Sequence, residues 1–255
     1  MSLPPSPGLS VIVITLNEAP RLEACLRSVA FADEVIVVDS GSTDDTVAVA
    51  QRLGARVQVT TDWPGFGAQK NRALDLATRE WVLSIDADER VTPRLRASIE
   101  AALQAGSSSA YQINRRSSYC GQYMKHSGWS PDWIVRFFRR GSARFTDDAV
   151  HESLRVDGPV GTLEGDLLHD SFADFESVLD KVNRYSTAGA QALHARGKRS
   201  SPAQALARGF WAFVRTYLLQ RGFLDGQRGL ALAISNAEGT YYRYLKLWLM
   251  QQRGR

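Results

Sequence analysis

The sequences VIVITLNE (residues 11–18) and VIVVDSGSTDDT (residues 35–46) decide the fold class. Each begins with four consecutive β-branched residues and continues with polar ones. Such a run predicts a strand that is buried on both faces, as in a parallel sheet. The sequence WVLSIDADE (residues 81–89) likewise predicts a buried strand, over 81–85, followed by an acidic loop.

Apolar residues at helical spacing separate these strands. We predict one helix that follows an N-cap at Ser42 or Thr43 and ends near residue 53. Strands that alternate with helices indicate βαβ units, and right-handed crossovers place the loops after the strands at one edge of the sheet. Ligands bind at that edge, so we expect the loops 15–18, 39–42 and 86–89 to form one site. The other predicted elements of this part are helices over 19–30, 69–77 and 93–105 and a short strand over 56–60.

The pattern changes after residue 110. Residues 115–132 are rich in Ser, Gly and aromatic residues, and we expect them to form a loop. Short strands are predicted over 111–114, 134–138 and 149–156 and near Leu167, and helices over 174–195, 202–221 and 229–251.

Charge divides the chain into two parts. Residues 1–170 carry 18 Lys/Arg and 22 Asp/Glu, whereas residues 171–255 carry 13 and 5, a net charge of +8. We predict an α/β domain over 9–170 and a basic helical extension over 171–255. A basic amphipathic segment indicates binding to an anionic surface, either a membrane or a nucleic acid.

Composition excludes several classes of protein. The 255-residue chain has 44% hydrophobic and 23% charged residues, which is typical of a globular protein. Two cysteines, Cys25 and Cys120, exclude a disulfide framework and a zinc-binding cluster. The motifs GxGxxG and GxxxxGK(S/T) are lacking, which disfavours a dinucleotide cofactor and a P-loop. With no signal peptide and no apolar stretch of about 18 residues, we expect a cytoplasmic chain.

The last two predicted helices combine apolar side chains at helical spacing with flanking cations. Leu206, Phe210 and Tyr217 share one such stripe, and Arg208 and Arg215 lie on another face. This pattern predicts either a helix that lies in a membrane interface or a helical hairpin that packs on the α/β domain. Both interpretations stay open on the sequence alone.

Two aspartates carry the main chemical hypothesis. Asp86 and Asp88 directly follow a predicted strand, and two such carboxylates can hold a divalent cation while leaving positions for phosphates. The alternative is a solvated acidic turn that caps the next helix. Asp39 ends another strand and can accept a hydrogen bond from a ribose hydroxyl or a base N–H. Lys70 lies at a predicted helix start, where phosphates bind readily.

Taken together, these segments resemble glycosyltransferase family 2, the inverting enzymes that use nucleotide sugars and have the GT-A fold. A narrower resemblance points to the branch of lipopolysaccharide core β-1,4-glucosyltransferases. The family resemblance rests on VIVITLNEAPRLEACLRSV (11–29), VIVVDSGSTDDT (35–46), GFGAQKNRAL (65–74) and WVLSIDADERV (81–91), and the narrower one on GWSPDWIVRFFRR (128–140), VHESL (150–154) and GFLDGQRGL (222–230).

The resemblance implies a role for each matching residue. Asp88 would bind Mg²⁺ or Mn²⁺ between the donor phosphates, and Asp86 would contact the ribose or the metal. The remaining donor-binding residues would be Thr15, Asn17, Glu18, Asp39, Lys70 and Arg136.

Inverting transfer also needs a catalytic base, a carboxylate that deprotonates the acceptor hydroxyl. Asp132 is the first candidate and Glu152 the second, although an ion pair is an equally good interpretation of Glu152. His151 and His169 are candidates for a third metal ligand or a phosphate contact, and lone histidines are more often structural.

The resemblance therefore implies transfer of glucose from UDP-glucose to a lipid-linked saccharide. It implies a peripheral enzyme, attached by its C-terminal helices to the inner face of the cytoplasmic membrane, with no nucleic-acid partner. The alternatives are a polyprenyl-phosphate glycosyltransferase and a non-catalytic protein that binds nucleotides or nucleic acid through the same fold.

Overall fold

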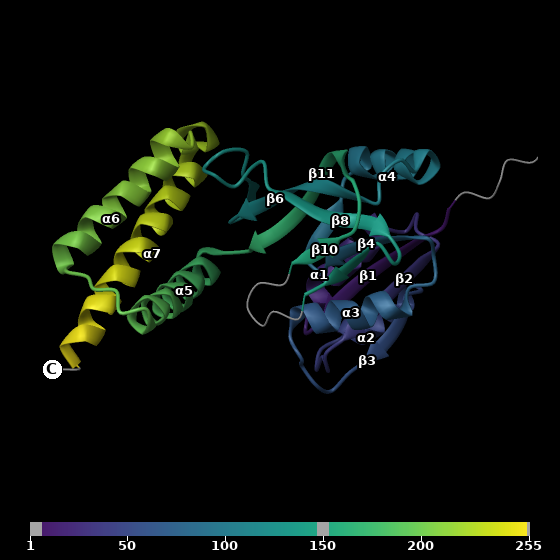
Figure 1. Cartoon of the computed structure of the whole chain (residues 1–255), viewed down its shortest axis with the longest axis horizontal. Coiled ribbons are helices and arrows are strands. Elements are labelled where there is room, and N and C mark those ends of the chain that lie inside the picture. The colour runs from purple at the N-terminus through teal and green to yellow at the C-terminus, as the bar shows by residue number, and fades with distance from the viewer. Residues whose placement is uncertain (1–6, 147–152, 254–255) are drawn as a thin grey trace, which may run out of the picture. The chain divides into compact units, whose positions relative to one another are not determined.

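The computed structural model describes residues 7–146 and 153–253 (Figure 1). The chain forms two compact units. The first consists of Met1–Arg115 and Asp132–His169, and the second of Arg116–Pro131 and Asp170–Arg255. The division into domains over 9–170 and 171–255 stays a prediction. The segment 116–131, which lies within the first of these ranges, packs within the second unit.

The first unit is built on a mixed sheet with a parallel part. Its order is β3-β2-β1-β4-β8-β6-β11-β5, and β7 pairs with β6. The pairs β3–β2, β2–β1 and β1–β4 are parallel, whereas β4–β8, β8–β6 and β11–β5 are antiparallel. The strands are β1 (Leu9–Thr15), β2 (Glu34–Asp39), β3 (Arg56–Val59), β4 (Trp81–Asp86), β5 (Glu89–Val91), β6 (Ala110–Tyr119), β7 (Gln122–Tyr123), β8 (Trp133–Arg139) and β11 (Val160–Phe172), with β9 (Ala143–Phe145) and β10 (Leu154–Val156) forming a separate antiparallel pair.

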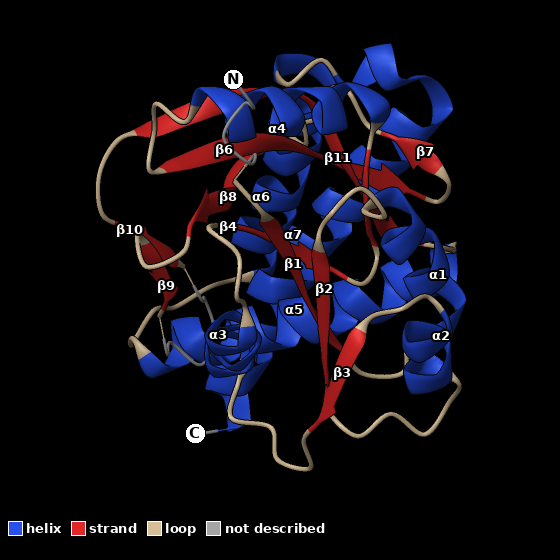
Figure 2. Cartoon of the chain, turned by 90° about the vertical axis from the view of Figure 1, so that its right-hand side faces the viewer, coloured by secondary structure: helices blue, strands red, loops and turns tan. Residues whose placement is uncertain are grey.

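Helices cover both faces of the parallel strands. The helices α1 (Ala19–Ser28), α2 (Thr46–Arg52) and α4 (Pro93–Ala105) share one hydrophobic core with Val11 and Val13 of β1. The intervening Ile12 points to the other face, where it packs with α3 (Phe66–Leu76). Figure 2 shows α1 and α2 on one side of β1, β2 and β3 and α3 on the other. This alternation explains why the strands are apolar on both faces.

The register of the parallel strands brings the predicted loops together. Thr15 is opposite Asp39, and Ile14 is opposite Asp86. The three polar loops therefore lie at the carboxyl edge of the sheet, as the βαβ pattern predicted.

Several predicted boundaries were wrong, and each has a physical cause. The helix α2 begins at Thr46 and not after Ser42 or Thr43, because the N–H groups of those two residues donate to Asp39 and Asn17 and form a turn. The expected loop 115–132 contains the second half of β6 and all of β7, which pair with each other. Of the helix predicted over 202–221, only the part up to Val214 is α-helical. The predicted strand over 149–156 falls partly outside the described residues.

The second unit contains three long helices. They are α5 (Phe175–Ala195), α6 (Pro202–Val214) and α7 (Gly226–Arg253); a π-helical turn (Arg215–Leu219) and a short 3-10 turn (Gly222–Asp225) connect α6 to α7. A Cβ on Gly209 of α6 would lie 3.0 Å from the Cβ of Tyr241, so the glycine permits close packing on α7. Asp225 holds the segment 116–131, because its carboxylate accepts hydrogen bonds from Lys125 N, His126 N and Ser127 Oγ.

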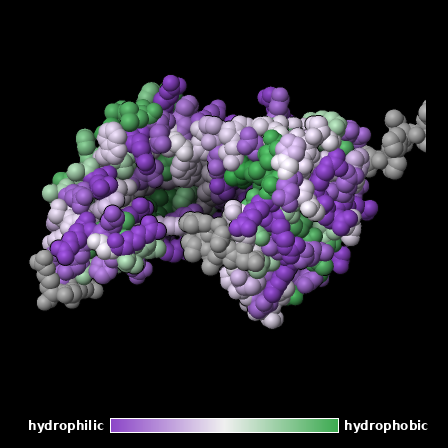
Figure 3. Space-filling view, in the orientation of Figure 1, coloured by the Kyte–Doolittle hydropathy of each residue, from purple (hydrophilic) through white to green (hydrophobic). Residues whose placement is uncertain are grey.

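The second unit exposes large apolar side chains. Leu206 and Phe210, one turn apart on α6, are 67% and 69% exposed. Figure 3 shows hydrophobic surface around the turn between α6 and α7. None of the described helices is long and apolar enough to cross a bilayer.

Candidate active site

An ion cluster lies at the carboxyl end of β4. Lys70 Nζ of α3 is 3.0 Å from Asp86 Oδ1, and Arg136 Nη2 of β8 is 2.7 Å from Asp86 Oδ2. Burial opposes ionisation of Asp86, but Arg136 and Lys70 outweigh it and hold the pKa of this carboxyl well below its usual range. Asp86 is therefore a fixed negative charge with a cation on each oxygen.

Glu89 is the fourth member of this cluster. It is fully buried, accepts a hydrogen bond from Asp86 N at 2.9 Å, and lies 3.4 Å from Arg136 Nη2. Burial raises the pKa of Glu89, and the charge of Arg136 opposes this rise. No role was predicted for Glu89 itself, although its position directly after Asp86 and Asp88 could have indicated one.

A cavity of about 370 Å³ opens beside this cluster. The loops after β1 and β4 form one part of its wall, and two exposed aromatic residues, Trp63 and Phe66, form another. Their rings meet edge to face, with centroids 4.9 Å apart. The full lining is Ile14, Thr15, Leu16, Glu18, Trp63, Phe66, Asp86, Ala87, Asp88 and His169. Neither aromatic residue was predicted to line the site. Trp63 lies outside the recognised motifs, and Phe66 lies within the motif at 65–74, where only Lys70 was assigned a role.

Asp88 and His169 approach each other in this cavity. His169 Nε2 is 3.4 Å from Asp88 Oδ2, and both side chains are about one-fifth exposed. Within residues 7–146 and 153–253, no group of three or more His, Cys, Asp or Glu side chains is arranged to hold a metal ion. One carboxylate and one imidazole still fit a divalent cation that takes its remaining ligands from phosphates and water.

The loops after β1 and β2 are held together by side chains predicted to bind the donor. Asp39 is fully buried and accepts hydrogen bonds from Thr15 Oγ1, Gly41 N, Ser42 N and Ser42 Oγ. Both of its oxygens are thus occupied by its own loop. Asn17, with φ of +56°, accepts from Thr43 N at 2.8 Å. Burial raises the pKa of the half-buried Glu18, and Arg21 opposes the rise.

Asp132 lies apart from the cavity lining. Its Oδ2 atom accepts hydrogen bonds from Arg115 Nε at 2.9 Å and pairs with Arg115 Nη2 at 2.8 Å. It lies four positions before Arg136 of β8, which is roughly 13 Å along an extended strand. The other candidate base, Glu152, and the candidate ligand His151 lie outside the described residues.

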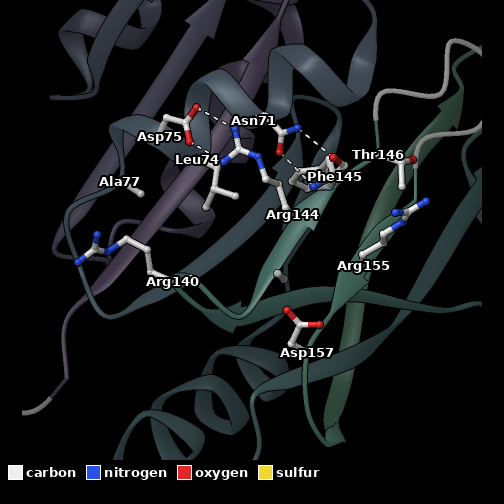
Figure 4. Close-up of a pocket in the computed structure, with 12 residues that line it drawn as sticks. Asn71, Leu74, Asp75, Ala77, Arg140, Arg144, Phe145, Thr146, Arg155 and Asp157 are labelled. Carbon is white, nitrogen blue, oxygen red and sulfur yellow. Dashed lines mark hydrogen bonds and ion pairs between the residues drawn. The ribbon is translucent and has the colours of Figure 1, made fainter.

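A larger cavity, of about 910 Å³, lies behind α3 (Figure 4). Its polar side chains are largely paired, since Arg144 binds Asp75 and Asn71 exchanges two hydrogen bonds with the backbone of Phe145. It reaches Ala77 and Arg140, and Arg140 N donates to Glu80 O just before β4 begins. This cavity is therefore near the amino ends of the strands, whereas ligands of such sheets bind at the carboxyl ends.

Comparisons with known proteins agree with this fold. Over its whole length the chain is similar to S. aureus TarS, solved in complex with UDP, with a TM-score of 0.50 and 17% identity, covering 97% of this chain and 92% of that one. The fold is the GT-A fold of glycosyltransferases, which confirms the predicted fold class.

The sequence identifies the family. Residues 10–154 match the family Glycosyl transferase family 2. An uncharacterized glycosyltransferase of Rickettsia prowazekii is 32% identical over 94% of this chain and 86% of that protein. The lipopolysaccharide core biosynthesis glycosyltransferase LpsC of Rhizobium meliloti is 30% identical over 94% of each chain. The chain belongs to glycosyltransferase family 2 and is a glycosyltransferase.

Arg136 is expected to be essential for the stability of the site. Replacing it in Arg136→Gln leaves Glu89 buried without a cation, which should lower the free energy of unfolding by about 3 kcal/mol in a urea titration at pH 7.5. The double variant Arg136→Gln/Glu89→Gln should recover part of this loss.

A matched control is Arg72→Gln, which breaks the exposed pair of Arg72 with Asp62 and should lower the free energy of unfolding much less than Arg136→Gln does. Equal losses for Arg136→Gln and Arg72→Gln would contradict the account of the buried cluster.

Proposed function

We propose that this glycosyltransferase moves glucose from UDP-glucose, with inversion, onto a lipid-linked saccharide such as the lipopolysaccharide core. The observation that carries the proposal is the pairing of Asp88 with His169 in a cavity walled by the fixed charge of Asp86. The similarity to LpsC over 94% of both chains supports the acceptor class. The donor assignment rests on the resemblance of residues 128–140 and 222–230 to the glucosyltransferase branch.

Asp88 and His169 are the residues that would hold the divalent cation, Mg²⁺ or Mn²⁺. Such a cation neutralises the charge that develops on a departing diphosphate. Asp86 has both oxygens on cations, which favours Asp88 as the metal ligand and leaves Asp86 to orient the loop. Lys70 and Arg136 keep Asp86 ionised, and the ion pair with Glu89 holds Arg136 in place.

The nucleoside would lie against the loops after β1 and β2. Thr15 and Glu18 line the cavity directly, and Trp63 and Phe66 offer aromatic surface on which a base or sugar ring can stack. Asp39 and Asn17 act on the donor through the loop that they hold in place.

Asp132 remains the first candidate base. In an inverting reaction it would take the proton of the acceptor hydroxyl while that oxygen bonds to the anomeric carbon and the nucleoside diphosphate leaves from the opposite side. Arg115 occupies Oδ2 and leaves Oδ1 for the hydroxyl. Glu152 is the second candidate.

The exposed face of the second unit would bind an anionic membrane. Leu206 and Phe210 supply apolar contact, and the net charge of +8 over residues 171–255 complements acidic lipid headgroups. Attachment to the inner face of the cytoplasmic membrane would bring the enzyme to a lipid-linked acceptor.

Asp88→Asn should weaken binding of UDP-glucose in the presence of Mn²⁺ by at least tenfold in calorimetry, because it removes a ligand of the cation. His169→Ala should act in the same direction. Glu164→Gln, five residues from His169 on the same strand and three-quarters exposed, is the matched control and should bind like the wild type. Unchanged, Mn²⁺-dependent binding by Asp88→Asn would refute the site assignment.

Asp132→Asn should lower kcat by roughly 10²–10⁴-fold and leave the Kd for the donor unchanged, because a base acts only in the transfer step. Arg115→Gln removes the ion pair but keeps the carboxylate, so it separates a structural role from a catalytic one. A similar loss in both variants would indicate structure alone, and a loss in Glu152→Gln without one in Asp132→Asn would make Glu152 the base.

The variant Leu206→Ser/Phe210→Ser should bind phosphatidylglycerol vesicles at least tenfold more weakly in sedimentation, since each buried apolar side chain contributes about 1.5–3 kcal/mol. Trp133→Ser, which removes an exposed ring from the first unit, is the control. Vesicle binding that persists in the double variant would exclude this face as the attachment surface.

A further inference from the structure

The second unit contains a pocket of about 480 Å³ that no step of the proposed reaction uses. It lies between α5 and α7, and β6, the end of β11 and the segment 116–131 contribute residues to it. Its volume is sufficient for a small saccharide. Aromatic residues, cations and small polar residues of α7 line the pocket.

The aromatic residues that form one wall of the pocket pack against one another. Trp129 stacks on Phe172 with ring centroids 6.0 Å apart and an interplanar angle of 25°. Tyr119 meets both rings edge to face and is almost fully buried. Its hydroxyl is satisfied by Ser235 Oγ at 2.8 Å. Because the π faces of aromatic rings are electronegative, such a wall suits the C–H face of a sugar ring.

Three cations line the same pocket, and none of its lining residues is an aspartate or a glutamate. The cations are Lys181, Arg215 and Arg243. Lys181 Nζ lies 4.5 Å from the centroid of the Phe172 ring. The guanidinium groups of Arg215 and Arg243 make no ion pair with any residue in the described part of the chain. The two arginines therefore place positive charge without a paired carboxylate beside the aromatic residues.

Local backbone geometry places both arginines. Arg215 begins the π-helical turn that follows α6, which Gln220 N closes with a hydrogen bond to Arg215 O at 2.8 Å. Single π-helical turns concentrate at functional sites. Arg243 crosses Gly189 of α5, where a Cβ would come within 2.7 Å of Arg243 Nε. A larger residue at position 189 would thus displace the side chain of Arg243 from this position.

We propose that this pocket binds an acidic saccharide. The sugar ring would pack on Trp129, which Phe172 supports from its stacked position. A phosphate or carboxylate group would bind Arg215 and Arg243, whose forked donors match such oxygens. The proposal rests on the proposed function in one respect, because the saccharide is then part of the acceptor. The same phosphate chemistry is present in phospholipid headgroups, so the test must separate the two sources.

The test is calorimetry of the full chain with glucose 6-phosphate, glucose and inorganic phosphate, and sedimentation with phosphatidylglycerol vesicles. Glucose 6-phosphate should bind more tightly than either glucose or phosphate. Arg215→Gln/Arg243→Gln should lower its affinity about tenfold to 100-fold, because charge-assisted hydrogen bonds are lost. Trp129→Leu, which keeps an apolar side chain, should lower it by up to about tenfold. Arg196→Gln, at the exposed end of α5, should have no effect.

Equal affinities for glucose 6-phosphate and glucose, or unchanged affinity in the double arginine variant, would overturn the proposal. If the double variant loses vesicle binding while no soluble saccharide binds to the wild type, the phosphate belongs to a lipid headgroup and the saccharide assignment is wrong.

Binding of UDP-glucose to the same variants separates this proposal from the proposed function. The double arginine variant should bind the donor like the wild type, because its substitutions lie in the second unit. If the wild type binds glucose 6-phosphate through the two arginines but binds no nucleotide sugar, the proposed function fails and the pocket stands. If the wild type binds only the nucleotide sugar, the saccharide pocket fails and the proposed function stands.

Discussion

The ion cluster of Lys70, Asp86, Glu89 and Arg136 is the constraint on which the active site depends. It joins α3, β4, β5 and β8, and so ties the parallel part of the sheet to the antiparallel part. Two cations and two carboxylates balance in a place where an isolated buried charge would be strongly unfavourable. The balance fixes the backbone after β4, and that backbone carries Asp88 toward His169. The position of Asp88, a candidate metal ligand, thus depends on the ion pairs of Asp86, two residues before it.

Local patterns predicted the first half of the fold well. The runs at 11–14, 35–38 and 81–85 are strands, and the helix over 93–105 has the predicted bounds, with Thr92 as its N-cap. Prediction failed where long-range pairing overrides local signals. Residues 115–119 look like a loop because they are polar, yet they continue β6. The start of α2 was placed too early because Asp39 and Asn17, from other elements, hold residues 42 and 43 in a turn.

Sequence patterns likewise located the edge of the sheet where the site lies but not its internal contacts. Asp86 and Asp88 were found from their spacing after a strand. Their different partners, two cations for Asp86 and His169 for Asp88, come from α3, β8 and β11, which are separate segments of the chain. Trp63 carried no signal because a loop aromatic residue has no periodic context, and Phe66 begins a helix whose pattern does not show which way its ring points. The pocket in the second unit was also invisible, since its cations and rings come from five separate segments.

The most direct test of the central claim is hydrogen–deuterium exchange of the full chain with and without UDP-glucose and Mn²⁺. The account predicts slower exchange in the backbone of residues 15–18, 63–70 and 86–89, which surround the 370 Å³ cavity. Protection confined to residues 140–146 and 153–157, beside the larger cavity behind α3, would contradict it. That result would place the donor at the amino ends of the strands and remove Asp88 from the chemistry.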